Sequence, residues 1–196
     1  MELVLASASP RRQELLALAG LRFVVAASDI DESRIGDESP LDYVARLAAA
    51  KARAQAGPDR CVLAADTIVV VAEEPRILGK PRHADDARSM LARLSGSIHT
   101  VMTGYAIYHP NAVKLRVVQS EVAFSLLSPS DVEGYLHSGE WRDKAGGYAV
   151  QGLAAAFVRS ITGSYSNIVG LPLCEVIADL RALKIVPPSW GIGQPC

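Results

Sequence analysis

The run Cys61-Val-Leu-Ala-Ala-Asp66-Thr67-Ile-Val-Val-Val71 is apolar at every position except Asp66 and Thr67. Such a run, rich in Val and Ile, is typical of a strand covered on both faces, so we predict that it lies at the centre of a sheet. An ionised carboxylate in a low-dielectric interior is costly unless a cation, a metal or several donors compensate for it. Asp66 is therefore either a functional carboxylate or the end of the strand, where it accepts hydrogen bonds from a turn.

The composition indicates a globular protein without a large charged surface. The chain has 196 residues, of which 49% are hydrophobic and 21% charged, enough for one large or two small lobes. A formal net charge of -1 and the lack of a polybasic run argue against nucleic acid or an anionic membrane as partner. No apolar stretch reaches the roughly 18 residues of a spanning helix, and no signal peptide is visible. We expect a cytoplasmic protein with reduced cysteines.

The N-terminal segment reads as a strand, a tight turn and a helix. Residues Glu2–Ala6 form the strand, and Ser9-Pro10 is an N-cap with proline at the first helical position, ahead of a helix that Gly20 ends. The sequence lacks both common phosphate-loop patterns, GxxxxGK[ST] and GxGxxG. Any phosphate must therefore be bound by this turn and by side chains.

Cations in the first turn of that helix point to an anion. Arg11 and Arg12 oppose the helix dipole, whereas Ser7, Ser9 and the free backbone N–H groups of the turn favour an anion. The two arginines make sense if a phosphate lies between them and the helix N-terminus. The alternative is a solvated arginine pair on a surface turn.

The next segment adds acids and an inward lysine. The loop Ser28–Ser33 is acidic, and its carboxylates are either solvated or ligands of a divalent cation. Ser39-Pro40 predicts the start of a long helix that ends at Ala56. Lys51 falls on the apolar side of that helix, so it either extends along its stem to solvent or reaches an internal anion.

The remaining pattern predicts a mixed sheet. Two long strands are joined by a short connection and so pair antiparallel, and Gln151 is expected as a buried amide in a later strand. Lys80 lies between Gly and Pro close to the central strand. Beyond these, we predict strands at Phe23–Ala27, Ile98–Tyr108, Val113–Leu127 and Tyr148–Val158, helices at Ala84–Leu94, Ser130–His137 and Leu173–Leu183, a turn at Ser160–Gly163, and an irregular tail at 187–196.

Several motifs occur in the order found in one known family. The chain resembles the Maf family of nucleoside triphosphate pyrophosphatases, from Ser7 to about Pro172. The resemblance implies a single α/β domain at 1–186, with a mixed central sheet flanked by helices, two lobes and a cleft between them, similar to the inosine triphosphatase fold. It also implies a divalent metal and often a homodimer. The motifs are Ala6-Ser-Ala-Ser-Pro-Arg-Arg12, Asp31-Glu32, Lys51-Ala-Arg53, Ala65-Asp-Thr-Ile-Val69, Gly79-Lys-Pro81, Ser95-Gly96 with Thr103-Gly104, Asp143-Lys-Ala-Gly-Gly-Tyr-Ala-Val-Gln-Gly152 and Gly170-Leu-Pro172.

The resemblance also implies a substrate. Arg11, Thr67 and Gln151 stand where members of the family that prefer dTTP and UTP have their specificity residues, and the branch acting on 7-methyl-GTP lacks this trio. The expected reaction is hydrolysis of dTTP and UTP to the monophosphate and pyrophosphate. Modified pyrimidine triphosphates are further candidate substrates. The alternatives are a nucleotide-binding regulator of septum formation with incidental hydrolysis, and a 7-methyl-GTP pyrophosphatase.

The residues provide the groups that this reaction needs. Water attacks the α-phosphorus while charge builds on the bridging oxygen, so the protein must position groups and neutralise charge. The resemblance assigns Asp66 as proton acceptor. Glu32 and Asp66 are the expected ligands of Mg²⁺ or Mn²⁺, and on physical grounds either of them could be the base. The expected phosphate-binding residues are Ser7, Ser9, Arg12, Lys51 and Lys80.

Overall fold

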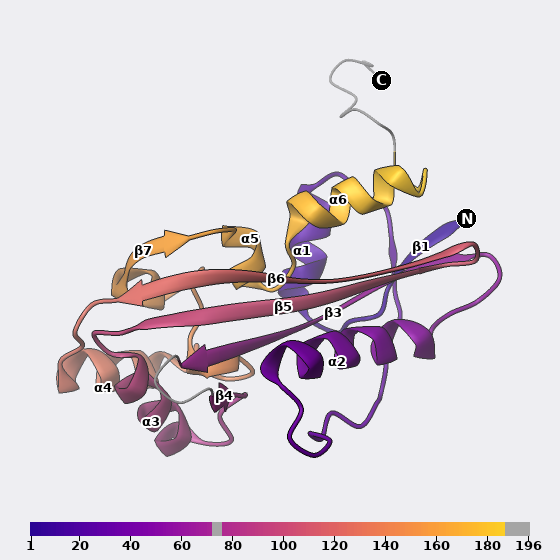
Figure 1. Ribbon diagram of the computed structural model, residues 1–196. Helices are drawn as coiled ribbons and strands as arrows, with labels where there is room; N and C mark the ends of the chain where they lie inside the picture. Colours follow the sequence, from indigo (N-terminus) through magenta and orange to yellow (C-terminus); the bar gives the residue numbers. More distant parts are fainter. Residues whose placement is uncertain (72–75, 187–196) are drawn as a thin grey trace, which may run out of the picture.

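The central strand is confirmed. A computed structural model describes residues 1–71 and 76–186, and in it β3 lies within a seven-stranded mixed sheet of order β2-β1-β3-β5-β6-β7, with β4 also paired to β3 (Figure 1). β1 runs parallel to β2 and β3, and the other pairings are antiparallel. The strands are β1 (Glu2–Leu5), β2 (Val24–Val25), β3 (Arg60–Val71), β4 (Arg76–Leu78), β5 (Ile98–His109), β6 (Ala112–Phe124) and β7 (Val158–Thr162).

Helices cover both faces of the sheet. The side chains of β3 alternate between the faces, so that Val62 and Ala64 pack under α2, whereas Cys61 and Leu63 belong to the larger core on the other face. Buried residues of α1, α3, α4, α5 and α6 complete that larger core. The helices are α1 (Pro10–Leu18), α2 (Pro40–Ala54), α3 (Ala84–Leu94), α4 (Pro129–Ser138), α5 (Tyr165–Val169) and α6 (Leu173–Ala182), with short 3-10 turns η1 (Ala145–Gly147) and η2 (Leu153–Phe157).

One side of β3 is only partly covered by other strands. β5 pairs along the whole of one side, from Val62 to Val71. On the opposite side β1 pairs up to Leu63, and β4 pairs from Val69 onward. Within the part of the chain that the structure describes, no strand flanks β3 between these two points. The segment carrying Asp66 and Thr67 is therefore open at one edge of the strand.

A glycine lets α2 approach the sheet beside this opening. Gly104 of β5 is the register partner of Asp66. A Cβ atom at Gly104 would lie 2.6 Å from the backbone oxygen of Val44 in α2, closer than real Cβ atoms come. The missing side chain therefore sets how near α2, and with it Lys51, lies to Asp66.

The prediction of a strand at Tyr148–Val158 is wrong. Gly146 and Gly147 both adopt positive φ, and the chain then forms turns and the 3-10 turn η2 before β7 begins at Val158. Alanines dominate η2, and alanine is depleted in strands. The predicted turn at Ser160–Gly163 is also wrong, because most of it is β7 paired with β6.

Further expectations concern the start of one helix, the C-terminal tail, the two lobes and membrane spans. Helix α4 begins at Pro129 and is capped by Ser128, two residues before the predicted Ser130. The predicted tail 187–196 lies outside the described residues, and the two-lobed arrangement stays a prediction. In the described part of the chain, none of the helices has the length and apolar character needed to cross a bilayer.

Candidate active site

A cavity of about 670 Å³ lies at the open edge of β3. Its lining combines the turn before α1, the acidic loop, α2, β3 and the loop around η1, which are distant in sequence. All ten predicted site residues line it, so the structure brings the whole predicted set together. These residues are Ser7, Ser9, Arg11, Arg12, Glu32, Lys51, Asp66, Thr67, Lys80 and Gln151.

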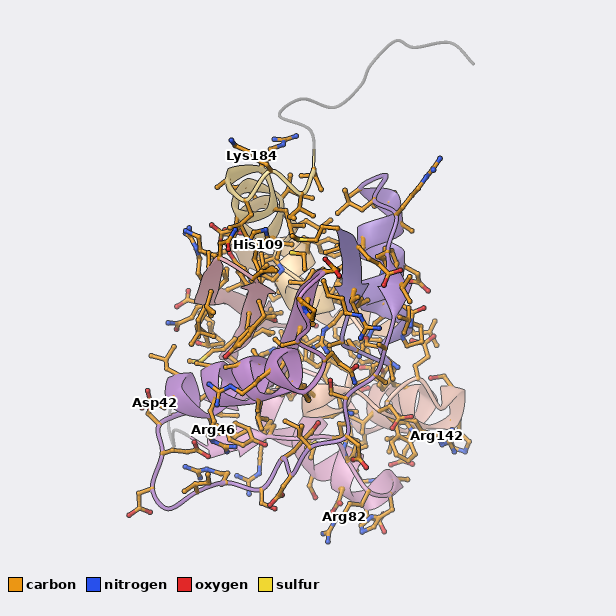
Figure 2. The ribbon with its side chains drawn as sticks, turned by 90° about the vertical axis from the view of Figure 1, so that its right-hand side faces the viewer. Asp42, Arg46, Arg82, His109, Arg142 and Lys184 are labelled. Carbon is orange, nitrogen blue, oxygen red and sulfur yellow. The ribbon has the colours of Figure 1, made fainter. Side chains whose placement is uncertain are left out.

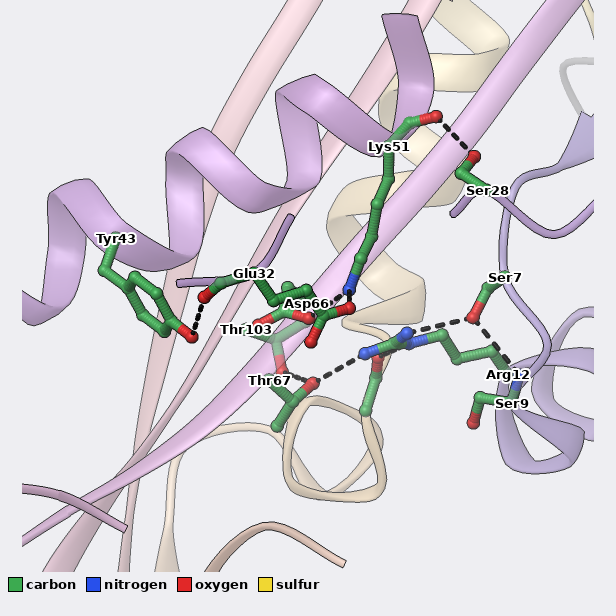
Figure 3. A network of polar contacts seen from close by, with 11 residues as sticks. Ser7, Ser9, Arg12, Ser28, Glu32, Tyr43, Lys51, Asp66, Thr67 and Thr103 are labelled. Atoms are coloured by element: carbon green, nitrogen blue, oxygen red, sulfur yellow. Dashed lines mark hydrogen bonds and ion pairs between the residues drawn. The ribbon is translucent and has the colours of Figure 1, made fainter. Parts of the chain in front are cut away.

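Two carboxylates share one lysine at the centre of the cavity. Lys51 Nζ lies 2.6 Å from Asp66 Oδ1 and 2.7 Å from Glu32 Oε1 (Figure 3). Lys51 is buried, so its long stem does not lead to solvent and the internal-anion interpretation is correct. Asp66 is not the end of a strand, because β3 continues to Val71. Its carboxylate pairs with Lys51 and does not merely accept hydrogen bonds from a turn.

Helix α2 holds Glu32 at two points. Besides the contact of its carboxylate with Lys51, its backbone oxygen accepts a hydrogen bond of 2.9 Å from Tyr43 OH, two turns earlier on the same helix. Partial burial raises the pKa of Glu32, but the hydrogen bond from Lys51 and the charges of Lys51, Lys80 and Arg12 outweigh it, so the pKa of Glu32 is lowered. Glu32 is thus kept ionised beside Asp66.

Arg12 reaches the site from the other face of the sheet. Its Nε donates to Gly170 O at 2.8 Å, Nη1 to Ser7 Oγ at 2.9 Å and Nη2 to Thr67 Oγ1 at 3.1 Å (Figure 3). Burial lowers the pKa of Arg12, and the charge of Asp66 works against that shift. These contacts exclude a solvated position for Arg12. Three hydrogen bonds fix the guanidinium, and Arg12 lines the cavity.

A chain of hydroxyl groups extends from Arg12 into the core. Thr103 Oγ1 donates to Asn167 O at 2.9 Å, and the hydroxyls of Thr67 and Thr103 lie 2.9 Å apart. Each hydroxyl has a single hydrogen. Because Thr103 uses its hydrogen on Asn167, Thr67 must donate to Thr103 while it accepts from Arg12.

The remaining predicted residues are held less tightly. Ser9 N donates to Ser7 Oγ at 3.3 Å, which forms the predicted turn. Arg11 Nη2 makes only a weak contact of 3.5 Å with Asp143 O, and burial lowers the pKa of Arg11. Lys80 and Gln151 are exposed where they line the cavity, so the expectation that Gln151 is a buried amide is wrong. The loss of the predicted strand explains this, because Gln151 lies in a turn before η2 and not in a strand of the sheet.

Sequence reasoning missed the residues that hold the site together. Thr103, Asn167, Gly170 and Tyr43 anchor Arg12, Thr67 and Glu32 through contacts between distant segments. Lys144 also lines the cavity and had no predicted role. The sequence signals for three of these residues were the motifs Thr103-Gly104, Asp143–Gly152 and Gly170-Leu-Pro172.

The site can hold a divalent cation with help from a ligand. Among the described residues, no cluster of three or more His, Cys, Asp or Glu side chains could coordinate a metal. Glu32 and Asp66 nevertheless meet at one point, where Lys51 contacts both. Mg²⁺ commonly uses one or two carboxylates and takes its other ligands from waters and substrate phosphates. The donor set therefore fits a metal that binds together with a phosphate ligand.

Comparison with known proteins identifies close relatives. The chain is 50% identical over 185 residues to a protein of Geobacter sulfurreducens named dTTP/UTP pyrophosphatase, covering 92% of this chain and 96% of that one. Proteins with the same name from Anaeromyxobacter dehalogenans and Syntrophus aciditrophicus are 51% and 48% identical, over 96% and 92% of this chain and 96% and 89% of theirs.

Structural and family comparisons extend over most of the chain. The Ham1 protein of Staphylococcus aureus superposes with a TM-score of 0.44 and 16% identity, over 63% of this chain and 72% of that chain. The profile of the family described as Maf-like protein matches residues 2–183, which include every residue of the site. The predicted family is therefore confirmed, and this chain belongs to the Maf family.

Proposed function

We propose that this protein hydrolyses dTTP and UTP, and modified pyrimidine triphosphates, to the nucleoside monophosphate and pyrophosphate, and so removes unwanted nucleotides from the pool. The observation that carries the proposal is the Asp66 carboxylate, which lines the cavity together with two cations. Lys51 contacts it directly, and its charge acts on Arg12. The relatives named dTTP/UTP pyrophosphatase, about half identical over nine tenths of the chain, support the substrate class.

The reaction requires water to attack the α-phosphorus. A new bond forms from the water oxygen to phosphorus, the bond to the bridging oxygen breaks, and pyrophosphate leaves with the electron pair. Asp66 accepts the proton of the attacking water, and Lys51 fixes the orientation of that carboxylate. Arg12 and Lys80 stabilise the charge that develops on the phosphate oxygens, and Ser7 and Ser9 line the phosphate side.

Glu32 and Asp66 would hold the metal, Mg²⁺ or Mn²⁺. When bound with the nucleotide, the cation would neutralise phosphate charge and orient the α-phosphorus. One lysine contacts both carboxylates, so the two acids are close enough to share proton transfer and metal binding. In this proposal Asp66 accepts the proton and Glu32 provides the larger share of metal binding.

Gln151, Arg11 and Thr67 recognise the base in this proposal. Uracil and thymine present N3–H between two carbonyl oxygens, and a carboxamide matches a donor and an acceptor at once. Arg11 donates to a carbonyl oxygen. A lost bidentate contact of this type is worth roughly 1–3 kcal/mol of discrimination, by analogy with base reading in duplexes.

The test is product analysis with a panel of ribo-, deoxy- and base-modified triphosphates, with Mg²⁺ or Mn²⁺. We expect dTTP and UTP to be the best substrates, with pyrophosphate and monophosphate in equal amounts. Asp66→Asn should lower kcat by orders of magnitude while nucleotide binding persists. Asp37→Asn, which changes an exposed carboxylate outside the cavity, should not.

Other outcomes have defined meanings. An Asp66→Asn variant as active as the parent would show that Asp66 has no chemical role. If an Asp66→Asn variant that no longer hydrolyses nucleotides keeps the effect of the protein on cells, the alternative of a regulator of septum formation is favoured. A preference for 7-methyl-GTP as substrate would overturn the roles of Arg11 and Gln151. Comparing Glu32→Gln with Asp66→Asn separates the main metal ligand from the base, since raised metal concentration should restore more activity in Glu32→Gln than in Asp66→Asn.

We also propose a homodimer, which the family resemblance implies, and a cytoplasmic location. Sedimentation at several protein concentrations and fractionation of cells check these two proposals. Neither is needed for the chemistry proposed above, because all the groups it uses come from one chain.

A further inference from the structure

We propose that Lys144 is a further substrate-binding residue and contacts the phosphate chain of the nucleotide together with Lys80. The inference deepens the function proposed above and rests on it for the identity of the nucleotide. Lys144 lines the cavity and is half-buried, in the loop that joins α4 to η1.

The ammonium of Lys144 has no anionic partner in the part of the chain that the structure describes. Its one hydrogen bond is to the backbone oxygen of Arg142, at 3.0 Å, within its own loop. Lys51, in contrast, contacts two carboxylates, and Arg12 donates to three protein oxygens. Lys144 can therefore meet an anionic ligand without giving up an ion pair.

The surroundings of Lys144 are unfavourable for a positive charge. Burial lowers the pKa of Lys144 most, and the neighbouring charges of Arg11 and Lys80 lower it further, against the opposing charges of Asp143 and Glu140. Cations that line one cavity repel one another unless an anion lies between them. A polyphosphate supplies such an anion, whereas a neutral pyrimidine base does not, so the phosphate chain is the matching part of the nucleotide.

The backbone holds Lys144 in this unfavourable place. Asp143, just before it, has a φ of 57°, a left-handed conformation that few residues other than glycine adopt. Just after it, Gly146 N donates to Gly79 O at 3.0 Å, which joins the loop to the segment that carries Lys80. A Cβ atom at Gly146 would lie 3.0 Å from Val69, so the loop is packed directly on β3. Lys144 and Lys80 are thus brought to one side of the cavity by the fold.

The experiment titrates the metal-free protein, in EDTA, with inorganic tripolyphosphate, and follows binding by calorimetry. We expect Lys144→Met to weaken binding about tenfold or more, and Lys144→Arg to restore most of it because the positive charge returns. Arg142→Met is the matched control. Arg142 is exposed at the outer surface, where its guanidinium stacks on Trp141, and it does not line the cavity (Figure 2). Its loss should leave binding unchanged.

Kinetics provide the second measurement. For the best triphosphate substrate, Lys144→Met should raise KM about tenfold or more and leave kcat within about threefold, because the contact is to the bound phosphates and not to the attacking water. Raising the salt concentration should weaken tripolyphosphate binding less in this variant than in the parent.

Three results would overturn the inference: no tripolyphosphate binding by the parent, equal binding by parent and Lys144→Met, or an equal loss in Arg142→Met. Failure of the proposed function is distinct from these. If no triphosphate is hydrolysed but tripolyphosphate binding depends on Lys144, the function is wrong and the phosphate contact stands. Melting curves of all four proteins show whether each variant is folded.

Discussion

Thr67 directs its only hydroxyl hydrogen into the protein. It accepts from Arg12 and donates to Thr103, which in turn donates to Asn167 O. Toward a nucleotide it can therefore present a lone pair or its methyl group, but no hydrogen for a base carbonyl. Its proposed role in specificity then comes from shape and from the position that it gives Arg12.

The first prediction concerns Thr103, which is fully buried. Thr103→Val keeps the shape but leaves the Thr67 hydroxyl without its acceptor and removes one of the hydrogen bonds to Asn167 O, which still accepts from Gly170 N. We expect the free energy of unfolding to fall by about 1–3 kcal/mol, and the KM for triphosphate to rise because Arg12 is less well held. Urea denaturation and steady-state kinetics measure the two effects. Thr103→Ser, which retains the hydroxyl, should keep nucleotide affinity; equal KM values for the two variants would contradict the prediction.

His99 predicts a pH dependence of stability. Its ring is fully buried, Nε2 lies 2.8 Å from Tyr148 OH, and Nδ1 has no hydrogen-bond partner within the described chain. Burial lowers the pKa of His99 from 6.5 to about 4. The folded protein therefore binds this proton less readily than the unfolded chain. The stability that results is complete above pH 6.5 and is lost as the pH falls toward 4.

We expect the free energy of unfolding to decrease by about 3 kcal/mol between pH 6.5 and 4 through this residue. Urea denaturation at a series of pH values measures it. His99→Gln has no titrating ring, so part of the slope of the unfolding free energy against pH should disappear. Identical slopes in the parent and His99→Gln would show that His99 does not cause the acid sensitivity.

Helix α2 holds together the acidic centre of the site, which consists of Glu32 and Asp66. Tyr43 and Lys51 hold Glu32 from positions two turns apart, and Lys51 also contacts Asp66. The helix can do this only because Gly104 lets its backbone lie close to the sheet, with Val44 O 2.6 Å from the place of a Cβ atom. The position of the helix and the geometry of the acids are therefore linked.

Gly104→Ala should be strongly destabilising. The added methyl group meets backbone atoms of Val44 that cannot rotate away, so we expect a loss of about 1–3 kcal/mol in the free energy of unfolding and a lower kcat as Lys51 is displaced. The matched control is Gly134→Ala inside α4, where a Cβ atom has no neighbour within 4 Å. It should stabilise the protein by about 0.5–1 kcal/mol. Equal thermal stability of both variants would refute the close-contact argument.

Local sequence signals predicted most of the elements. The apolar run Cys61–Val71 is β3 except for one residue, and the Ser-Pro pairs at Ser9 and Ser39 mark the starts of α1 and α2. These signals work because caps and apolar runs act over a few residues. Tyr148–Val158 failed because its conformation depends on distant contacts, such as Leu153 N to Glu140 Oε2 at 2.8 Å.

At the scale of the whole molecule, the active site exists because β1 and β4 leave a gap along β3. Asp66 and Thr67 are neighbours in a strand, so their side chains point to opposite faces, Asp66 toward α2 and Thr67 toward Arg12. The gap lets both line one cavity. The motifs identified the residues that meet there, but not the gap itself, because the gap depends on where two other strands begin and end.

The acidic centre then joins three distant parts of the chain through one ammonium group. Lys51 links α2 to Asp66 of β3 and to Glu32 of the loop before α2. Without Lys51, two carboxylates would face each other in a partly buried site, where like charges repel. A divalent cation is the natural replacement for the missing charge, since the same oxygens suit Mg²⁺.

Lys51→Met should therefore change how metal affects the stability of the entire fold. Without metal, we expect a lower melting temperature than that of the parent, and added Mg²⁺ should raise it more in the variant, because binding to the folded state shifts unfolding by mass action. Activity should stay low, since Asp66 has lost the group that orients it. Lys114→Met on β6, outside the cavity, should behave like the parent. If Mg²⁺ raises the melting temperature equally in the parent and Lys51→Met, then Lys51 does not offset the charges of Glu32 and Asp66, and the cation binds elsewhere.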